Sequence, residues 1–204
     1  MAQLHFTHGA MGSGKSLQLM NMAGELKRHE LPFMVMKPKV DTKAGNAITS
    51  RVLKGVLLEA DVLYTQENNL RDTITNELGK RGLDTFARVL VDEAQFSTPA
   101  HIDQLLEVAI KDDIEVRAFG LRTDFQTKFF PGSQRLMEQA HQITELETTC
   151  RCGGYGVNNA RKINGQFVFA GDQVAIHTDE VDYEALCREC YTGELTLFTQ
   201  SLAK

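Results

Sequence analysis

Gly9-Ala10-Met11-Gly12-Ser13-Gly14-Lys15-Ser16 decides the fold, because it fits the pattern G-x-x-x-x-G-K-[ST]. Residues 3–8 before it alternate apolar and polar side chains, which predicts a strand, and residues 15–30 after it have apolar side chains at helical spacing. A glycine-rich turn between a strand and a helix points backbone N–H groups at bound phosphates. We therefore expect these eight residues to bind nucleotide phosphates, with Lys15 on the outer phosphates and Ser16 as a Mg²⁺ ligand.

Strand and helix patterns alternate through residues 1–149. Apolar runs predict buried strands at 33–36, 88–92, 114–121 and 143–149, and shorter strands at 56–58 and 62–64. Helical periodicity predicts helices at about 68–80, from Pro99 onward after an N-cap at Thr98, and at 133–140. Residues 37–50 are expected to form a long polar loop. This alternation predicts an α/β fold with an open, parallel sheet.

Two carboxylates follow the apolar strand at 88–92. An aspartate at the end of such a strand holds Mg²⁺ in phosphate-loop proteins, which is the role expected of Asp92. Glu93 comes next at the same edge, where a carboxylate can accept a proton from an attacking hydroxyl group. Asp92-Glu93-Ala94-Gln95 also resembles a helicase tetrad, so a zinc-containing ATPase acting on nucleic acid or a protein partner is the alternative hypothesis.

The composition favours a phosphotransferase with a small substrate. A helicase usually needs a second motor domain and a basic channel. This chain has 204 residues, with 22 Lys and Arg against 27 Asp and Glu, so its net charge is −5. We therefore expect no nucleic-acid partner. No apolar run approaches the roughly 20 residues of a membrane helix. Residues 1–6 lack the features of a secretory signal, so a cytoplasmic location is expected.

Five phenylalanines lie in an otherwise polar stretch, and four of them flank or occupy the loop that follows the fourth strand. A nucleobase needs such flat, apolar walls. We expect Phe119 to lie in the core and the others to be available for a pocket: Phe96, Phe125, Phe129 and Phe130.

All four cysteines lie in two close pairs near the end of the chain: Cys150 with Cys152, and Cys187 with Cys190. Four thiolates favour a closed, structural Zn²⁺ site. Free buried thiols, or a redox pair at Cys187 and Cys190, are the alternatives. A metal here would join the two ends of residues 153–186, as at the base of a lid.

Together these motifs resemble the zinc-containing type II thymidine kinases, in a bacterial-like form. The resemblance spans about residues 4–192, and it also uses Ser50-Arg51, the run from Gly120 to Phe125, and Tyr183 before the second cysteine pair. It implies a RecA-like core at 1–149, a small zinc lobe at 150–192 whose lasso-like loop covers the nucleoside, a tail at 193–204, and a homotetramer. The implied reaction is the salvage step ATP + thymidine → ADP + thymidine 5′-phosphate.

The resemblance also assigns roles to individual residues. Glu93 is implied as the general base. The implied wall of the base pocket is Met11, Phe96, Leu121, Phe125 and Phe130, and the implied lasso contacts with thymine are Asn159, Val174, Ile176 and Tyr183. Arg161 aligns with a family arginine without an assigned role. Two departures stand out: Thr178-Asp179 replaces the usual Gly-Gly, and Lys43 lies near Asp41 where an arginine is usual.

Overall fold

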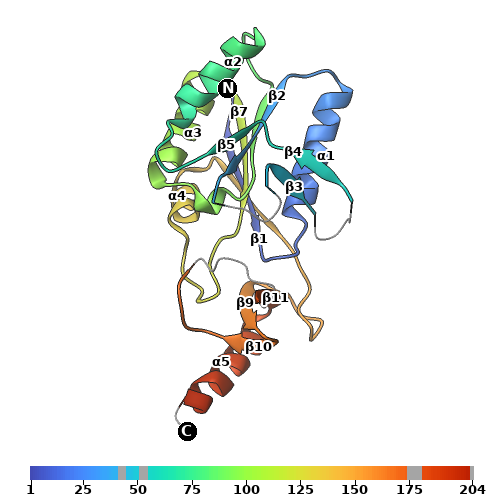
Figure 1. The fold of residues 1–204 in the computed structure, drawn as a ribbon, viewed down its shortest axis with the longest axis vertical. Coiled ribbons are helices and arrows are strands. Elements are labelled where there is room, and N and C mark those ends of the chain that lie inside the picture. Colours follow the sequence, from blue (N-terminus) through green and yellow to red (C-terminus); the bar gives the residue numbers. More distant parts are fainter. Residues whose placement is uncertain (41–44, 51–54, 174–180, 203–204) are drawn as a thin grey trace.

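The computed structural model describes residues 1–40, 45–50, 55–173 and 181–202. Its centre is a six-stranded sheet in the order β5-β2-β6-β7-β1-β8, with every neighbouring pair parallel (Figure 1). The strands are β1 (Leu4–Gly9), β2 (Phe33–Pro38), β5 (Val62–Tyr64), β6 (Arg88–Val91), β7 (Glu115–Gly120) and β8 (Gln142–Leu146). One strand, β7, separates β1, which precedes the glycine-rich loop, from β6, which precedes Asp92.

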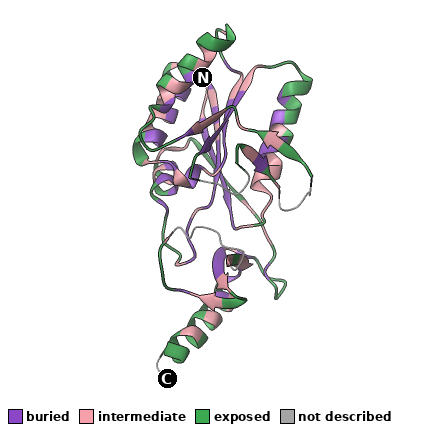
Figure 2. Ribbon diagram, in the orientation of Figure 1, coloured by how far each residue is buried: buried purple, intermediate pink, exposed green. Residues whose placement is uncertain are grey.

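Helices cover both faces of this sheet. Helix α1 (Lys15–Arg28) packs on one face, and α2 (Leu70–Arg81), α3 (Pro99–Lys111) and α4 (Pro131–Gln139) lie on the other (Figure 1). The two faces are packed by separate apolar clusters, one including Leu19 and Phe119 and the other including Phe6 and Leu105. The buried strands between these helices form the core (Figure 2). Phe119 is fully buried, which confirms its expected place in the core.

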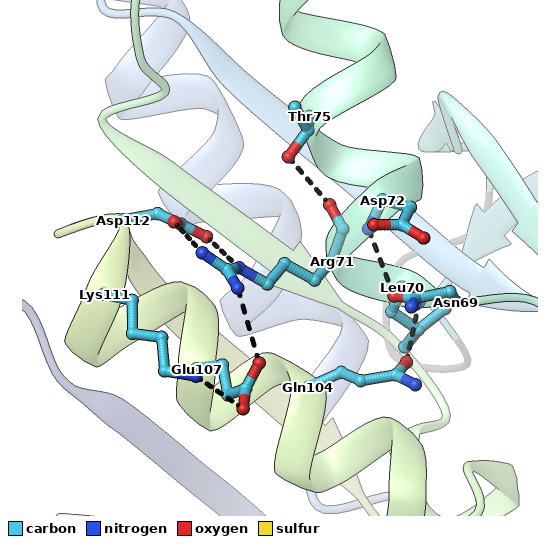
Figure 3. Close-up of polar contacts among 9 residues, drawn as sticks. All are labelled: Asn69, Leu70, Arg71, Asp72, Thr75, Gln104, Glu107, Lys111 and Asp112. Carbon is cyan, nitrogen blue, oxygen red and sulfur yellow. Dashed lines mark hydrogen bonds and ion pairs between the residues drawn. The ribbon is translucent and has the colours of Figure 1, made fainter.

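Local sequence signals set several helix ends. Thr98 caps α3: its hydroxyl accepts a hydrogen bond from the N–H of His101, and the N–H of Thr98 donates to Nδ1 of His101. Gly82 ends α2 in the left-handed conformation that glycine adopts without strain. Helices α2 and α3 are joined by polar contacts, where Arg71 donates to both carboxylate oxygens of Asp112 and Leu70 N–H donates to Gln104 (Figure 3).

The last part of the chain forms a small lobe beside the carboxyl edge of the sheet (Figure 1). Strand β9 (Asn158–Ile163) pairs antiparallel with β10 (Gln166–Val168) and with β11 (Val181–Leu186). Helix α5 (Arg188–Leu202) follows, and its Tyr191 and Phe198 pack on Phe169. Residues 193–202, which the sequence analysis assigned to a tail, thus continue the helix that begins at the second cysteine pair.

One segment differs from expectation because it pairs with the next strand along the chain. Part of the polar stretch 37–50 forms β3 (Ala47–Thr49), which pairs antiparallel with β4 (Leu57–Glu59). Lys37, the first residue of the polar stretch, is buried, and its ammonium group donates to the carbonyls of Gly45 and Ala47. A short 3-10 helix, η1 (Ala94–Phe96), follows β6. The other expected strands and helices of residues 1–149 are confirmed within a few residues, but the strand expected to be buried at 143–149 is not buried. This strand, β8, lies at the edge of the sheet, and four of its five residues are exposed.

Candidate active site

The phosphate-binding loop lies between β1 and α1, as the sequence predicts. Gly12 and Gly14 have φ angles of 80° and 87°, which side-chain-bearing residues rarely adopt. Gly9 is required for another reason, because a Cβ atom there would lie 2.5 Å from Ser13 Oγ and 2.6 Å from the carbonyl oxygen of Leu146. The Lys15 ammonium group donates to the carbonyls of Gly9 and Ala10, at 2.9 Å each, so the cation lies against the loop.

Asp92 and Glu93 follow β6 at the same edge of the sheet. Asp92 is buried, whereas Glu93 has φ 48° and ψ 38°, a left-handed conformation that is strained for a residue with a side chain. Gln95 fixes the Glu93 side chain: its amide nitrogen donates to the Glu93 carboxylate and its amide oxygen accepts from the N–H of Leu121, at 3.0 Å. Gln95 is itself buried. It therefore joins the glutamate to the segment after β7.

Asn159, from β9 of the lobe, makes a second link across this edge. Its side-chain oxygen accepts from the N–H of Met11 at 2.7 Å, and its nitrogen donates to the carbonyl of Thr123 at 3.1 Å. The phosphate-binding loop, the segment after β7 and the glutamate are thus joined through two side-chain amides, those of Asn159 and Gln95. The family resemblance implies that Asn159 binds the nucleoside; here its amide contacts the protein backbone.

The expected wall residues Phe96, Leu121, Phe125 and Phe130 lie in the segments that follow β6 and β7. The rings of Phe96 and Phe130 meet edge to face, with centroids 5.7 Å apart. Phe125 is buried under the guanidinium group of Arg161, whose carbon lies 3.6 Å from the ring centroid. Phe129, by contrast, is 44% exposed.

Asp124 organises the loop that carries Phe125. One of its carboxylate oxygens accepts from the N–H groups of Gln126 and Lys128, and the other accepts from the side chain of Gln173. Sequence reasoning gave no role to Asp124 or Gln173, because isolated polar residues in loops carry no periodic signal. Val174, Ile176, Thr178-Asp179, Lys43 and Arg51 lie outside the described residues, so those predictions stay as they were.

The four cysteines come together at the base of the lobe. Their sulfur atoms all lie within 4.8 Å of one another, and the Sγ atoms of Cys152 and Cys187 are 3.7 Å apart. Although burial disfavours its charge, hydrogen bonds from the backbone at Cys152 and Cys187 lower the pKa of the Cys150 thiol to about 6. The cluster (Cys150, Cys152, Cys187 and Cys190) can hold a metal ion, as the spacing predicts.

Comparison with known proteins decides the family. The family model described as "Thymidine kinase" matches residues 2–191 of this chain. The chain belongs to the thymidine kinase family. It is therefore a kinase of the P-loop type, and this membership favours a phosphotransferase over the ATPase alternative.

Curated thymidine kinases match over nearly the whole chain. The protein from Rhodopirellula baltica is 36% identical over 92% of this chain and 87% of its own length. The one from Legionella pneumophila strain Paris is 37% identical, over 94% and 90%. The one from Cutibacterium acnes is 37% identical, over 98% and 95%. Among solved structures, the genome packaging NTPase B204 of Sulfolobus turreted icosahedral virus 2 aligns with a TM-score of 0.45 and 15% identity, over 72% of this chain and 75% of that one; the assignment does not rest on it.

Proposed function

We propose that this thymidine kinase family member transfers the γ-phosphoryl group of ATP to the 5′-hydroxyl group of thymidine, with Glu93 as the general base. The observation that carries the proposal is the position of Glu93. Its strained backbone and the amide of Gln95 hold the carboxylate at the carboxyl edge of the sheet, where β1 also delivers the phosphate-binding loop. Ligands of open α/β sheets bind at this edge.

Residues of the phosphate-binding loop would bind the nucleotide. Backbone N–H groups at the start of α1 would face the β- and γ-phosphates, whereas the N–H of Met11 is already bonded to Asn159. Lys15 would exchange its contacts with Gly9 and Ala10 for phosphate oxygens. The Ser16 hydroxyl group and the Asp92 carboxylate would hold Mg²⁺. When bound, that ion neutralises charge on the transferring phosphoryl group. Ala94 and Gln95 lie beside this nucleotide site, and the Gln95 amide holds the Glu93 carboxylate.

Glu93 would accept the 5′-hydroxyl proton as the oxygen–phosphorus bond forms. The bond from the γ-phosphorus to the bridging oxygen breaks in the same step, and ADP leaves with that electron pair. A hydroxyl group is a weak nucleophile at neutral pH, so a positioned base contributes about 10²–10⁴-fold to the rate. Met11, Phe96, Leu121, Phe125 and Phe130 would supply the apolar wall for the base, and Tyr183 and the proposed lasso residues would close over it.

The geometry of the four-cysteine cluster fits a structural zinc ion. Four sulfurs at about 2.3 Å from a tetrahedral ion lie about 3.8 Å apart, close to the 3.7 Å between Cys152 and Cys187. A disulfide would need about 2.05 Å. Four thiolates leave no open position, so this ion would hold the lobe together without taking part in the transfer.

Location, assembly and domain limits complete the proposal. No helix among the described residues is long and apolar enough to span a bilayer. A cytoplasmic location is proposed because four uncrosslinked thiols suit a reducing compartment. The homotetramer and the limits 1–149, 150–192 and 193–204 remain proposals from the resemblance, with the last boundary falling inside α5.

Substitution of Glu93 tests the central residue. Glu93→Gln keeps the size of the side chain but removes its basicity. It should lower kcat for thymidine by about 10²-fold or more, with similar Kd values for ATP and thymidine. Glu107→Gln is the matched control, because Glu107 is a carboxylate of α3 that pairs with Lys111 and Arg71. An unchanged kcat with a raised KM for thymidine would instead make Glu93 a binding residue.

A further inference from the structure

Arg161 is a buried cation whose described partners are all neutral. It lies on β9 and is 3% exposed. Its Nε donates to the hydroxyl group of Tyr183 at 3.0 Å, and its two terminal nitrogens donate to the carbonyls of Asp172 and Gln173, at 3.0 and 3.1 Å. One face of the guanidinium group stacks on Phe125. Burial of a charge is costly unless its hydrogen bonds are satisfied, so a built arrangement of this kind indicates a defined task.

The two carbonyls belong to residues 171–173, which immediately precede the proposed lasso residues. Three further hydrogen bonds hold the same segment against the loop of Phe125. The Gln173 side chain donates to Asp124 at 3.0 Å and to the carbonyl of Phe129 at 3.2 Å, and Gln126 donates to the carbonyl of Gly171 at 3.0 Å. Residues 171–173 are therefore docked on the proposed nucleoside pocket, with Arg161 between the segment and the pocket wall.

Only arginine can make this set of contacts. The guanidinium group is planar and presents its N–H donors in a fixed fork, so one side chain can hold two successive carbonyls and a hydroxyl group while its face covers a ring. A lysine carries a single ammonium group on a flexible stem. It can reach one of these oxygens, but it cannot stack on Phe125 and hold both carbonyls together.

We propose that Arg161 is a positioning residue for the nucleoside, which sets the affinity for thymidine by fixing residues 171–173 against Phe125. This inference rests on the proposed function, because it takes Phe125 as part of the thymidine pocket. Arg161 acts through Phe125 and through the backbone it holds, and it takes no part in the transfer of the phosphoryl group. The phosphate-binding loop makes no described contact with its guanidinium group. The effect of losing Arg161 should therefore fall on thymidine and spare ATP.

Three variants of the protein test this assignment. Arg161→Gln removes the fork and the charge, and Arg161→Lys keeps the charge alone. Lys162→Gln is the matched control, because Lys162 is the next residue on β9 and pairs with Glu184. The KM values for thymidine and for ATP are measured separately. The rise in melting temperature caused by each ligand is measured as well, and this does not depend on turnover.

Both Arg161 variants should raise the KM for thymidine by about tenfold or more, since at least two hydrogen bonds are lost. Their KM for ATP should stay within about twofold. The thermal shift caused by thymidine should shrink while the shift caused by ATP persists, and Lys162→Gln should match the wild type. A KM for thymidine within twofold of wild type would overturn the assignment, and so would a parallel rise of both KM values. If the wild-type protein bound thymidine without phosphorylating it, the proposed function would be refuted. The thermal shifts caused by thymidine in the wild type and the Arg161 variants would still test the role of Arg161.

Discussion

Gln95→Leu should uncouple Glu93 from the rest of the site. Leucine has a similar volume but cannot donate to the Glu93 carboxylate or accept from the N–H of Leu121. A hydrogen bond to a charged group is worth about 1.5–3 kcal/mol. If this bond holds the base in its working position, its loss should lower kcat by about 10- to 100-fold, because 1.4 kcal/mol corresponds to tenfold. The KM for ATP should change little.

The same substitution leaves a buried N–H group without its acceptor, which has a separate effect on stability. An unpaired, buried N–H group lowers the free energy of unfolding by about 1–3 kcal/mol, so the melting temperature should fall by about 2–12 °C for a chain of this size. Gln104→Leu is the matched control, because Gln104 also accepts from a backbone N–H group, that of Leu70, and it has no described contact with Glu93. It should lower the melting temperature and leave kcat unchanged. ADP release in a coupled assay measures both rates. If Gln95→Leu lost stability but kept kcat within twofold, Gln95 would have no part in placing the base.

Three more outcomes follow from the structure. Lys15→Ala should reduce turnover by about 10²-fold or more while the circular dichroism spectrum stays native, and near-normal turnover would refute the role of the phosphate-binding loop. Native protein should contain about one zinc ion per chain, and its removal by a chelator should lower the melting temperature; full stability in metal-free protein would refute the structural site. Burial lowers the pKa of His101, and its Nδ1 must be unprotonated to accept from Thr98 N–H, so its stabilising effect is present above about pH 6.5 and is lost as the pH falls. When the pH is lowered from 7.5 to 5.5, the melting temperature of His101→Gln should therefore fall less than that of the wild type. Equal falls in the two proteins would refute this role of His101.

Features that depend on nearby residues were predictable from the sequence. The glycine pattern before Lys15, the Thr98-Pro99 start of α3 and Gly82 at the end of α2 each reflect backbone constraints that act over a few residues. The four-cysteine cluster was predictable for a different reason. Thiols placed in two close pairs indicate a shared metal site, even though 34 residues, 153–186, separate Cys152 from Cys187.

Features that depend on distant partners were not predictable in the same way. Strand β3 has only three residues, and although Ile48 and Thr49 favour strands, a run this short cannot be told from a loop until its pairing with β4 is known. The contact between Asn159 and Met11 joins residues 148 positions apart, and nothing in the local sequence of either one indicates it. The proposed task of Arg161 is also unreadable from the sequence, because two of its partners are backbone carbonyls, which every residue possesses.

The most direct test of the account is phosphoryl transfer by the purified protein. The protein is incubated with ATP, Mg²⁺ and each of the four common deoxynucleosides in turn, and the products are separated by chromatography. Thymidine should give thymidine 5′-phosphate and ADP in equal amounts, and the wild-type protein should form them far faster than Glu93→Gln. ADP release that proceeds at the same rate without any nucleoside, with no thymidine 5′-phosphate formed, would contradict this expectation.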